Sequence, residues 1–230
     1  MSSPNYYDGG SIEVGPSSPP TSINSDGRES YEESDYVYVK YRIANKRLSS
    51  MENEISDVED DWMYTETFEY IHGRMLYPWS GNFESVVQKC YANLTPGGYF
   101  ELQDSLLIAC IDESWNGKAI QRWANLLLEG AKKLGIDWEK VEKYPQWISA
   151  AGFKDIKEVE GAWPTNSWPK SGFQKHLGRS ANEILKQGLH GMSVEIFTAA
   201  HGWTEEEVDS LLEDVKENLD DRNIHCYVPM

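Results

Sequence analysis

The stretch that decides the fold is NLTPGGYFELQDS, residues 93–105. A Pro-Gly-Gly turn precedes an apolar run that is typical of a strand, and the run ends in Glu101, Gln103 and Asp104. Such a strand is typical of a parallel α/β sheet, where ligands bind at the carboxyl ends of the strands. We therefore expect a binding edge here, provided that neighbouring segments supply the rest of the sheet.

The residues before this stretch predict a second strand and a helix. FEYIHGRM (68–75) is a short apolar run and predicts a buried strand. Residues 80–94 carry apolar side chains at the spacing of an amphipathic helix. Strand, helix and strand form a βαβ unit, which predicts a parallel pair joined by a right-handed crossover.

The part of the chain after residue 105 is predicted to be mostly helical. We expect a long helix over 116–134 that stops at Gly135, because glycine is common just after a helix ends. A short helix is expected over 147–151, closed by Gly152, and a strand over 153–164.

Two further helical segments follow. Residues 173–200 are predicted to be helical but broken at three glycines, namely Gly178, Gly188 and Gly191. In the last helix, Thr204 and Glu207 have the spacing of a capping box, and Trp203 and Val208 that of a hydrophobic staple.

The overall charge limits the classes of partner. The chain has 230 residues, with 21 Lys and Arg against 38 Asp and Glu, and a net charge of −17. This charge disfavours direct binding to nucleic acid and to anionic membranes. No apolar run has the length of a membrane span, and the first residues lack the features of a secretion signal. We therefore expect a cytoplasmic protein, with a nuclear one remaining open.

Composition divides the chain into three parts. Residues 1–35 are rich in Ser, Pro, Gly and Asn and predict a disordered tail. Residues 36–53 are a short linker or the remnant of something larger, and residues 54–230 predict a partial α/β domain. The three cysteines form no CxxC pair, so we predict reduced thiols and no metal site.

A series of segments resembles one protein family. The segments are VEDDW (58–62), FEYIHGRM (68–75), LTPGGYFELQD (94–104), AAGFKDIKE (150–158), WPK (168–170), FTAAHGWTEEEV (197–208) and DDRNIHCYVP (220–229). In this order they resemble the fungal LaeA-like, or UMTA-type, class I S-adenosylmethionine-dependent methyltransferases. The resemblance implies a Rossmann-like, mostly parallel sheet with added helices in the C-terminal half. It also implies S-adenosylmethionine as cofactor and a small-molecule acceptor in fungal secondary metabolism.

The glycine-rich loop of that family, D-x-G-x-G-x-G, does not occur in this sequence. The residues before Asp57 are too few for two further βαβ units, each of which takes about 30 residues or more. We therefore expect an incomplete sheet. Three explanations stay open: a divergent protein that has lost cofactor binding, a gene sequence with a skipped exon, or a partner chain that completes the sheet.

These explanations lead to two functions. The first is methyl transfer from S-adenosylmethionine. The alternative is a catalytically inactive pseudo-methyltransferase that serves as an accessory, scaffold or regulatory subunit of such a pathway. Because a half-sheet leaves an unpaired edge, we expect a pathway enzyme, another protein partner or a second copy of the chain to cover it.

The resemblance also implies cofactor-binding residues. Asp57 falls at the carboxylate that accepts from the adenine amino group, with Val58 beside it; the alternative is a solvated acidic loop. His72, Gly73 and Arg74 fall at the lip of the crevice for cofactor and substrate. There Gly73 lets backbone approach a ligand, and His72 is the candidate catalytic base for an acceptor. The alternative is that His72 and Arg74 bind backbone or local acids.

The end of the second strand supplies candidate substrate-binding residues. Alternation places Glu101 and Gln103 on one side of the strand and Asp104 on the other. The alternative is solvated polarity at a strand end. Both alternatives remain open from the sequence.

Overall fold

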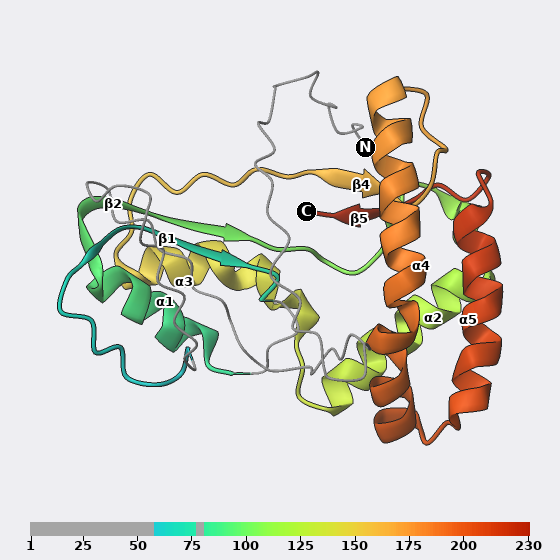
Figure 1. The fold of residues 1–230 in the computed structure, drawn as a ribbon, viewed down its shortest axis with the longest axis horizontal. Coiled ribbons are helices and arrows are strands. Elements are labelled where there is room, and N and C mark those ends of the chain that lie inside the picture. Colours follow the sequence, from blue (N-terminus) through green and yellow to red (C-terminus); the bar gives the residue numbers. More distant parts are fainter. Residues whose placement is uncertain (1–57, 77–80) are drawn as a thin grey trace, which may run out of the picture. The chain divides into compact units, whose positions relative to one another are not determined.

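A computed structural model describes residues 58–76 and 81–230 (Figure 1). The predicted tail over 1–35, the segment 36–53 and the candidate Asp57 lie outside the described residues. Their predictions therefore stay predictions.

The predicted βαβ unit is confirmed in its elements and in its parallel pairing. Strand β1 (Phe68–Arg74) leads through helix α1 (Phe83–Ala92) to strand β2 (Leu94–Gln103), and the two strands pair in parallel. Helix α1 begins where the Asn82 side chain accepts from the amide of Ser85, a common N-cap arrangement.

Strand β2 begins earlier than the sequence indicated, at Leu94 rather than after the turn. Phe68 pairs with Leu94, but the next pair is Tyr70 with Tyr99, so the Pro-Gly-Gly segment is an irregularity within the strand. Gly97 adopts a φ of 85° there, which glycine tolerates without strain. The Pro-Gly-Gly segment thus interrupts the regular pairing near the start of β2 but does not end it.

A second, antiparallel sheet lies in the C-terminal half and was not predicted. Its order is β3 (Ala109–Cys110), β5 (Cys226–Pro229) and β4 (Ala162–Pro164). The strand expected over 153–164 is confirmed only in its last three residues. Val159, at 87% exposure, has no core to pack against, so the residues before β4 gain nothing from a strand.

The helices of the C-terminal half follow the predicted order. They are η1 (Glu113–Trp115), α2 (Ala119–Lys133), η2 (Trp138–Lys143), α3 (Tyr144–Ala151), α4 (Gly172–His201) and α5 (Glu205–Asp220). The stops at Gly135 and Gly152 are confirmed, with φ of 83° and 110°. The capping box between Thr204 and Glu207 is also confirmed. The fold is therefore α/β, with an incomplete parallel sheet and helices in the C-terminal half.

Helix α4 corrects one prediction, because it runs without a break through all three glycines. A Cβ on Gly178 would lie 2.0 Å from the carbonyl oxygen of Asn166. This glycine lets the helix approach the loop after β4, as small residues do at close contacts. It is a contact residue rather than a helix break.

The main core lies between α2, α4 and α5 and includes Trp123, Leu127, Phe197 and Leu212. Trp123 donates through Nε1 to the hydroxyl of Ser193 at 2.8 Å, so its indole nitrogen is satisfied in the core. Two smaller clusters fill the βαβ region. Within the described residues, no helix is both long and apolar enough to cross a bilayer.

Candidate functional site

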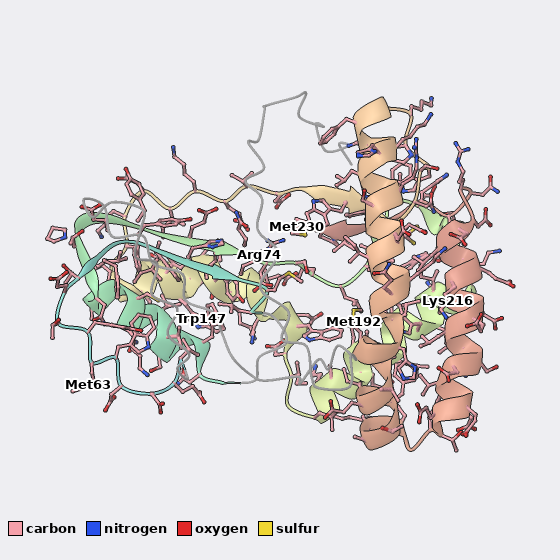
Figure 2. The ribbon with its side chains drawn as sticks, in the orientation of Figure 1. Met63, Arg74, Trp147, Met192, Lys216 and Met230 are labelled. Carbon is pink, nitrogen blue, oxygen red and sulfur yellow. The ribbon has the colours of Figure 1, made fainter. Side chains whose placement is uncertain are left out.

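The carboxyl ends of β1 and β2 bring four of the predicted site residues together. His72 pairs with Glu101 across the two strands, and Arg74 with Gln103. Figure 2 shows Arg74 at the end of β1, where it is exposed to solvent. The expected juxtaposition of these candidates at one edge is therefore present.

Glu101 is held by its neighbours at this edge. Tyr70 donates its hydroxyl to one carboxylate oxygen, and Gln103 donates through Nε2 to the other at 2.8 Å. The Tyr70 hydrogen bond lowers the pKa of Glu101, with His72 as a minor contributor. Burial and the Glu101 hydrogen bond raise the pKa of Tyr70 to about 12. At neutral pH this pair is therefore a carboxylate and a neutral phenol.

His72 is half-buried, and its ring stacks on Tyr70, with 6.1 Å between ring centroids and 6° between planes. Its Nε2 is buried and has no hydrogen-bond partner among the described residues. A buried polar atom left unsatisfied costs roughly 1–3 kcal/mol, so such atoms call for an explanation. A ligand atom that bonds to Nε2 would remove this cost.

Gly73 has a packing explanation that the sequence did not show. A Cβ at this position would lie 2.8 Å from Leu76 Cδ1 and 2.9 Å from Leu102 Cδ2. The next residue but one, Met75, has a φ of 56°, which is uncommon outside glycine and often marks functional sites. The approach of a ligand to Gly73 stays a prediction.

Val58 is a core residue in the structure. It is 5% exposed and packs with Ile71, Val86 and Cys90. Its carbonyl oxygen accepts from Trp62 Nε1 at 3.2 Å. Its side chain therefore anchors the segment before β1, and a contact with the cofactor stays a prediction.

Asp104 points to the opposite side of β2 from Glu101, as strand alternation predicted, and it is 8% exposed. Its Oδ2 accepts from the Leu76 amide at 3.0 Å and from the Tyr144 hydroxyl at 2.8 Å. Its Oδ1 accepts from the Ser105 amide at 3.1 Å. Asp104 thus joins the end of β1 to helix α3, and a contact with substrate remains a prediction.

Lys140 completes this group, which we call the Asp104 cluster (Asp104, Lys140 and Tyr144). Lys140 is only 5% exposed, and burial lowers its pKa to about 8 against the opposing effects of Asp104 and Asp137. Burial, followed by the Asp104 charge, raises the pKa of Tyr144. The sequence analysis missed Lys140 and Tyr144, because no spacing pattern links residues on separate elements.

A small cavity lies beside this cluster. Its volume is about 240 Å³, and its lining includes Asn82, Phe83, Asp137, Lys140 and Trp147. Because α1 follows β1, the start of α1 lies at the same end of the βαβ unit as the candidate edge. The cavity is thus part of the region where a sheet of this class binds ligands.

Comparison with known proteins supports the resemblance. No protein-family model matches the chain. The chain is 29% identical over 177 residues to a probable methyltransferase, tdiE, of Emericella nidulans, covering 76% of this chain and 56% of that protein. It is 28% identical over 174 residues to the methyltransferase pytC of Aspergillus terreus, covering 75% and 54%. It is 24% identical over 174 residues to the protein-methionine methyltransferase laeA of Emericella nidulans, covering 74% and 46%.

The chain is thus similar to fungal proteins that are named as methyltransferases and as LaeA-type regulators of secondary metabolism. It spans about half the length of the curated relatives that it matches. Relatives named as secondary metabolism regulators, such as LAE1 of Cochliobolus heterostrophus, match at 28% identity over 176 residues.

Methyltransferases of the LaeA-like family imply S-adenosylmethionine as the methyl donor in general. Among the described residues, the buried Nε2 of His72 lacks a partner at the carboxyl edge, where the donor or its acceptor would bind. The described residues do not supply a cradle for the amino-acid end of the donor, since the sequence holds no D-x-G-x-G-x-G segment. Of the described cofactor-binding candidates, His72, Gly73 and Arg74 lie at the carboxyl end of β1, whereas Val58 lies in a core cluster.

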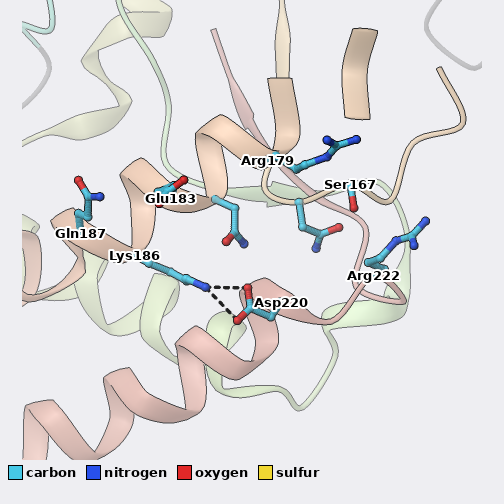
Figure 3. A pocket seen from close by; sticks show the side chains of 9 residues that line it. Ser167, Arg179, Glu183, Lys186, Gln187, Asp220 and Arg222 are labelled. Atoms are coloured by element: carbon cyan, nitrogen blue, oxygen red, sulfur yellow. Dashed lines mark hydrogen bonds and ion pairs between the residues drawn. The ribbon is translucent and has the colours of Figure 1, made fainter. Parts of the chain in front are cut away.

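A larger cavity, of about 560 Å³, lies outside this edge. Figure 3 shows it between α4, the end of α5 and the loop that carries Ser167. Lys186 and Asp220 form an ion pair across it, at 2.8 and 2.9 Å. None of the site residues predicted from the LaeA-like resemblance lines this cavity.

Proposed function

We propose that the whole protein transfers a methyl group to a small molecule of fungal secondary metabolism, and that residues 68–105 form the acceptor side of the site. The observation that carries this proposal is the buried, unpartnered Nε2 of His72 among the described residues. It lies at the carboxyl edge of a parallel strand pair, where α/β sheets bind ligands. The names of the relatives, which include methyltransferases, support the same reaction class.

The chain's own residues suit proton removal from an acceptor. S-adenosylmethionine, when bound, supplies a methyl group on an activated sulfonium. His72 Nε2 accepts the proton of the acceptor hydroxyl or amine, while the stacked Tyr70 ring holds the imidazole plane. Glu101 lies opposite His72 in the strand register. The lowered pKa of Glu101 keeps this carboxylate ionised, and its negative charge stabilises the imidazolium that forms at His72.

Titration with S-adenosylhomocysteine and a methyl-transfer assay on the intact chain test this proposal. We expect His72→Ala to keep the affinity of the parent chain and to reduce transfer about 10²–10⁴-fold, the usual contribution of a general base. His176→Ala is the matched control, because His176 is an exposed residue of α4. Equal transfer by His72→Ala and the parent chain would contradict the role of His72.

The alternative proposal is a non-catalytic accessory or scaffold subunit of such a pathway. It is favoured by the state of the acids at the edge, because Glu101 binds Tyr70 and Gln103, and Asp104 binds Leu76 and Tyr144. These carboxylates are satisfied without a ligand. A chain that is folded by circular dichroism and shows no heat of binding with S-adenosylhomocysteine would support this alternative and reject the first proposal.

Under both proposals, we expect a protein partner to bind the β1–β2 sheet. Among the described strands, β1 and β2 pair only with each other, whereas parallel strands normally lie within larger, covered sheets. Tyr99 on β2 is 75% exposed. We propose that a pathway enzyme or a second copy of the chain covers this sheet in the cytoplasm or nucleus. Light scattering after gel filtration, alone and with candidate pathway enzymes, tests this; a stable monomer throughout would oppose it.

A further inference from the structure

Two thiols face each other across the antiparallel sheet of the C-terminal half. Cys110 on β3 lies directly opposite Cys226 on β5. The neighbouring ladder bond runs from the amide of Ile111 to the carbonyl of His225 at 3.2 Å. This pattern makes Cys110 and Cys226 a non-hydrogen-bonded pair, in which opposite Cα atoms are about 4.5 Å apart and the side chains are closest.

This separation lies within the range that a disulfide spans, about 4.4–6.8 Å between Cα atoms. Side chains that are directly opposite in an antiparallel pair also project from the same face of the sheet. Both cysteines are free thiols in the structure. A bond between them therefore requires little movement of the strands.

The two sulfurs differ in their surroundings. Cys226 is fully buried, whereas Cys110 is half-buried. Burial, followed by the nearby Cys110 sulfur, raises the pKa of Cys226, which therefore keeps its proton. Cys110 Sγ lies 3.3 Å from Ser114 Oγ and 3.6 Å from Asp112 Oδ1. An oxidant from solvent thus reaches Cys110 before Cys226.

We propose that Cys110 and Cys226 form a site of oxidative modification, at which hydrogen peroxide converts the two thiols into an intrachain disulfide. In the first step the Cys110 sulfur attacks one peroxide oxygen, the O–O bond breaks, and Cys110 sulfenic acid and one water form. In the second step the Cys226 sulfur attacks the Cys110 sulfur and loses its proton. The hydroxyl leaves as a second water. Two thiols are thus oxidised and one peroxide is reduced to two waters.

The bond would fasten strand β5 in the middle of its sheet. Besides pairing with β3 and β4, β5 accepts the Leu106 amide at the Pro229 carbonyl and the Thr165 amide at the Cys226 carbonyl, both at 3.0 Å. A disulfide would close residues 111–225 into a loop, which removes conformations from the unfolded chain. Oxidation should therefore stabilise the C-terminal core against unfolding.

The test is peroxide treatment of the purified full chain at neutral pH, followed by intact mass and peptide mapping without reductant. We expect the loss of two hydrogen atoms, one linked peptide pair that holds Cys110 and Cys226, and a Tm that rises by several degrees and falls back with dithiothreitol. Cys110→Ser should lose both the linkage and the rise in Tm.

Cys90→Ala is the matched control, because Cys90 is also buried but belongs to the cluster around Val58 in the βαβ region. This variant should still form the linkage. If Cys110→Ser fails to fold, alkylation of Cys110 in the parent chain before peroxide must prevent the mass loss. The proposal is overturned by disulfides between chains only, by a linkage to Cys90, or by sulfinic acid at Cys110 with Cys226 still a thiol.

Discussion

The βαβ region and the helical C-terminal region are filled in different ways. The helical core contains seventeen buried apolar residues in one cluster, with α2, α4 and α5 as its main walls. Among its described residues, the βαβ region has two clusters of four buried residues each. Its second cluster is supplemented by aromatic contacts, such as Phe83 stacked on Tyr144 at 4.3 Å, and by the Asp104 cluster.

The candidate edge therefore lies in the region with the smaller apolar core. Binding regions are commonly drawn from the less stable parts of a fold. Hydrophobic burial scales with the area removed from water, so we expect amides of β1 and β2 to exchange faster than those of α2 and α5. The following predictions test this difference, beginning with the largest effect.

Phe197→Ala should produce the largest loss of stability, because it removes a ring from the large helical core. Phe197 is fully buried and packs edge-to-face on Trp203, with centroids 5.2 Å apart. Removing the ring leaves a cavity, so we expect the free energy of unfolding to fall by about 3–5 kcal/mol. Urea unfolding followed by circular dichroism measures it.

Phe173→Ala is the control for this substitution, since Phe173 lies on the same helix but is 76% exposed. We expect a change within about 0.5 kcal/mol. Comparable losses in both variants would show that α4 does not bury the face that the structure assigns to the core.

Tyr144→Phe should have a smaller and more local effect in the βαβ region. The variant removes the phenol that donates to Asp104 at 2.8 Å and leaves a buried carboxylate with one donor fewer. The expected loss is about 1–3 kcal/mol. Hydrogen exchange should increase at Leu76, whose amide donates to the same oxygen, and should be unchanged in α5.

Tyr99→Phe is the matched control, because the Tyr99 side chain is 75% exposed on β2. Tyr99→Phe removes only a solvated hydroxyl, so the free energy of unfolding should be unchanged. If Tyr144→Phe also increased hydrogen exchange in the helical core, the two regions would not be independent in stability.

The sequence predicts well the features that depend on local chemistry. The β1–α1–β2 unit follows from apolar spacing, and the Thr204 capping box and the Gly152 stop follow from the residues at the helix ends themselves. It does not predict the antiparallel sheet, because β3 has two residues and β4 three, too few for a period. Those strands exist through long-range pairing with β5.

The site follows the same division. The edge formed by His72 and Glu101 could be predicted, because parallel strands align their carboxyl ends. The Asp104 cluster could not, since Lys140 and Tyr144 are placed by the packing of η2 and α3. The hydrogen bond from Tyr70 to Glu101 likewise depends on strand register, which a single sequence does not fix.

The Asp104 cluster also makes stability depend on pH. Lys140 has a pKa of about 8 in the folded chain, below the 10.5 of an exposed lysine, because of burial. Between these values the unfolded chain binds more protons than the folded chain, so the free energy of unfolding rises with pH. From pH 7 to pH 9 we expect this contribution to grow by on the order of 1 kcal/mol.

Urea unfolding at both pH values measures this change, with Lys140→Met as the reference that has no titrating group at the position. The parent chain should gain stability relative to Lys140→Met as pH rises. A parallel change in the two proteins would show that Lys140 is hydrated in solution, and the βαβ region would then be more open than the structure indicates.

Gly191→Ala should have the smallest effect and the opposite sign. Gly191 lies in the middle of α4, is exposed and has open space where a Cβ would be. Alanine favours a helix interior over glycine by about 0.5–1 kcal/mol, so thermal unfolding should occur at a higher Tm. Gly178→Ala is the contrasting variant, because its Cβ would meet the Asn166 carbonyl at 2.0 Å, and it should be destabilised. If instead α4 breaks at Gly191, as the sequence alone suggested, alanine there would lower the Tm. The helical region would then be less continuous than its single large core requires.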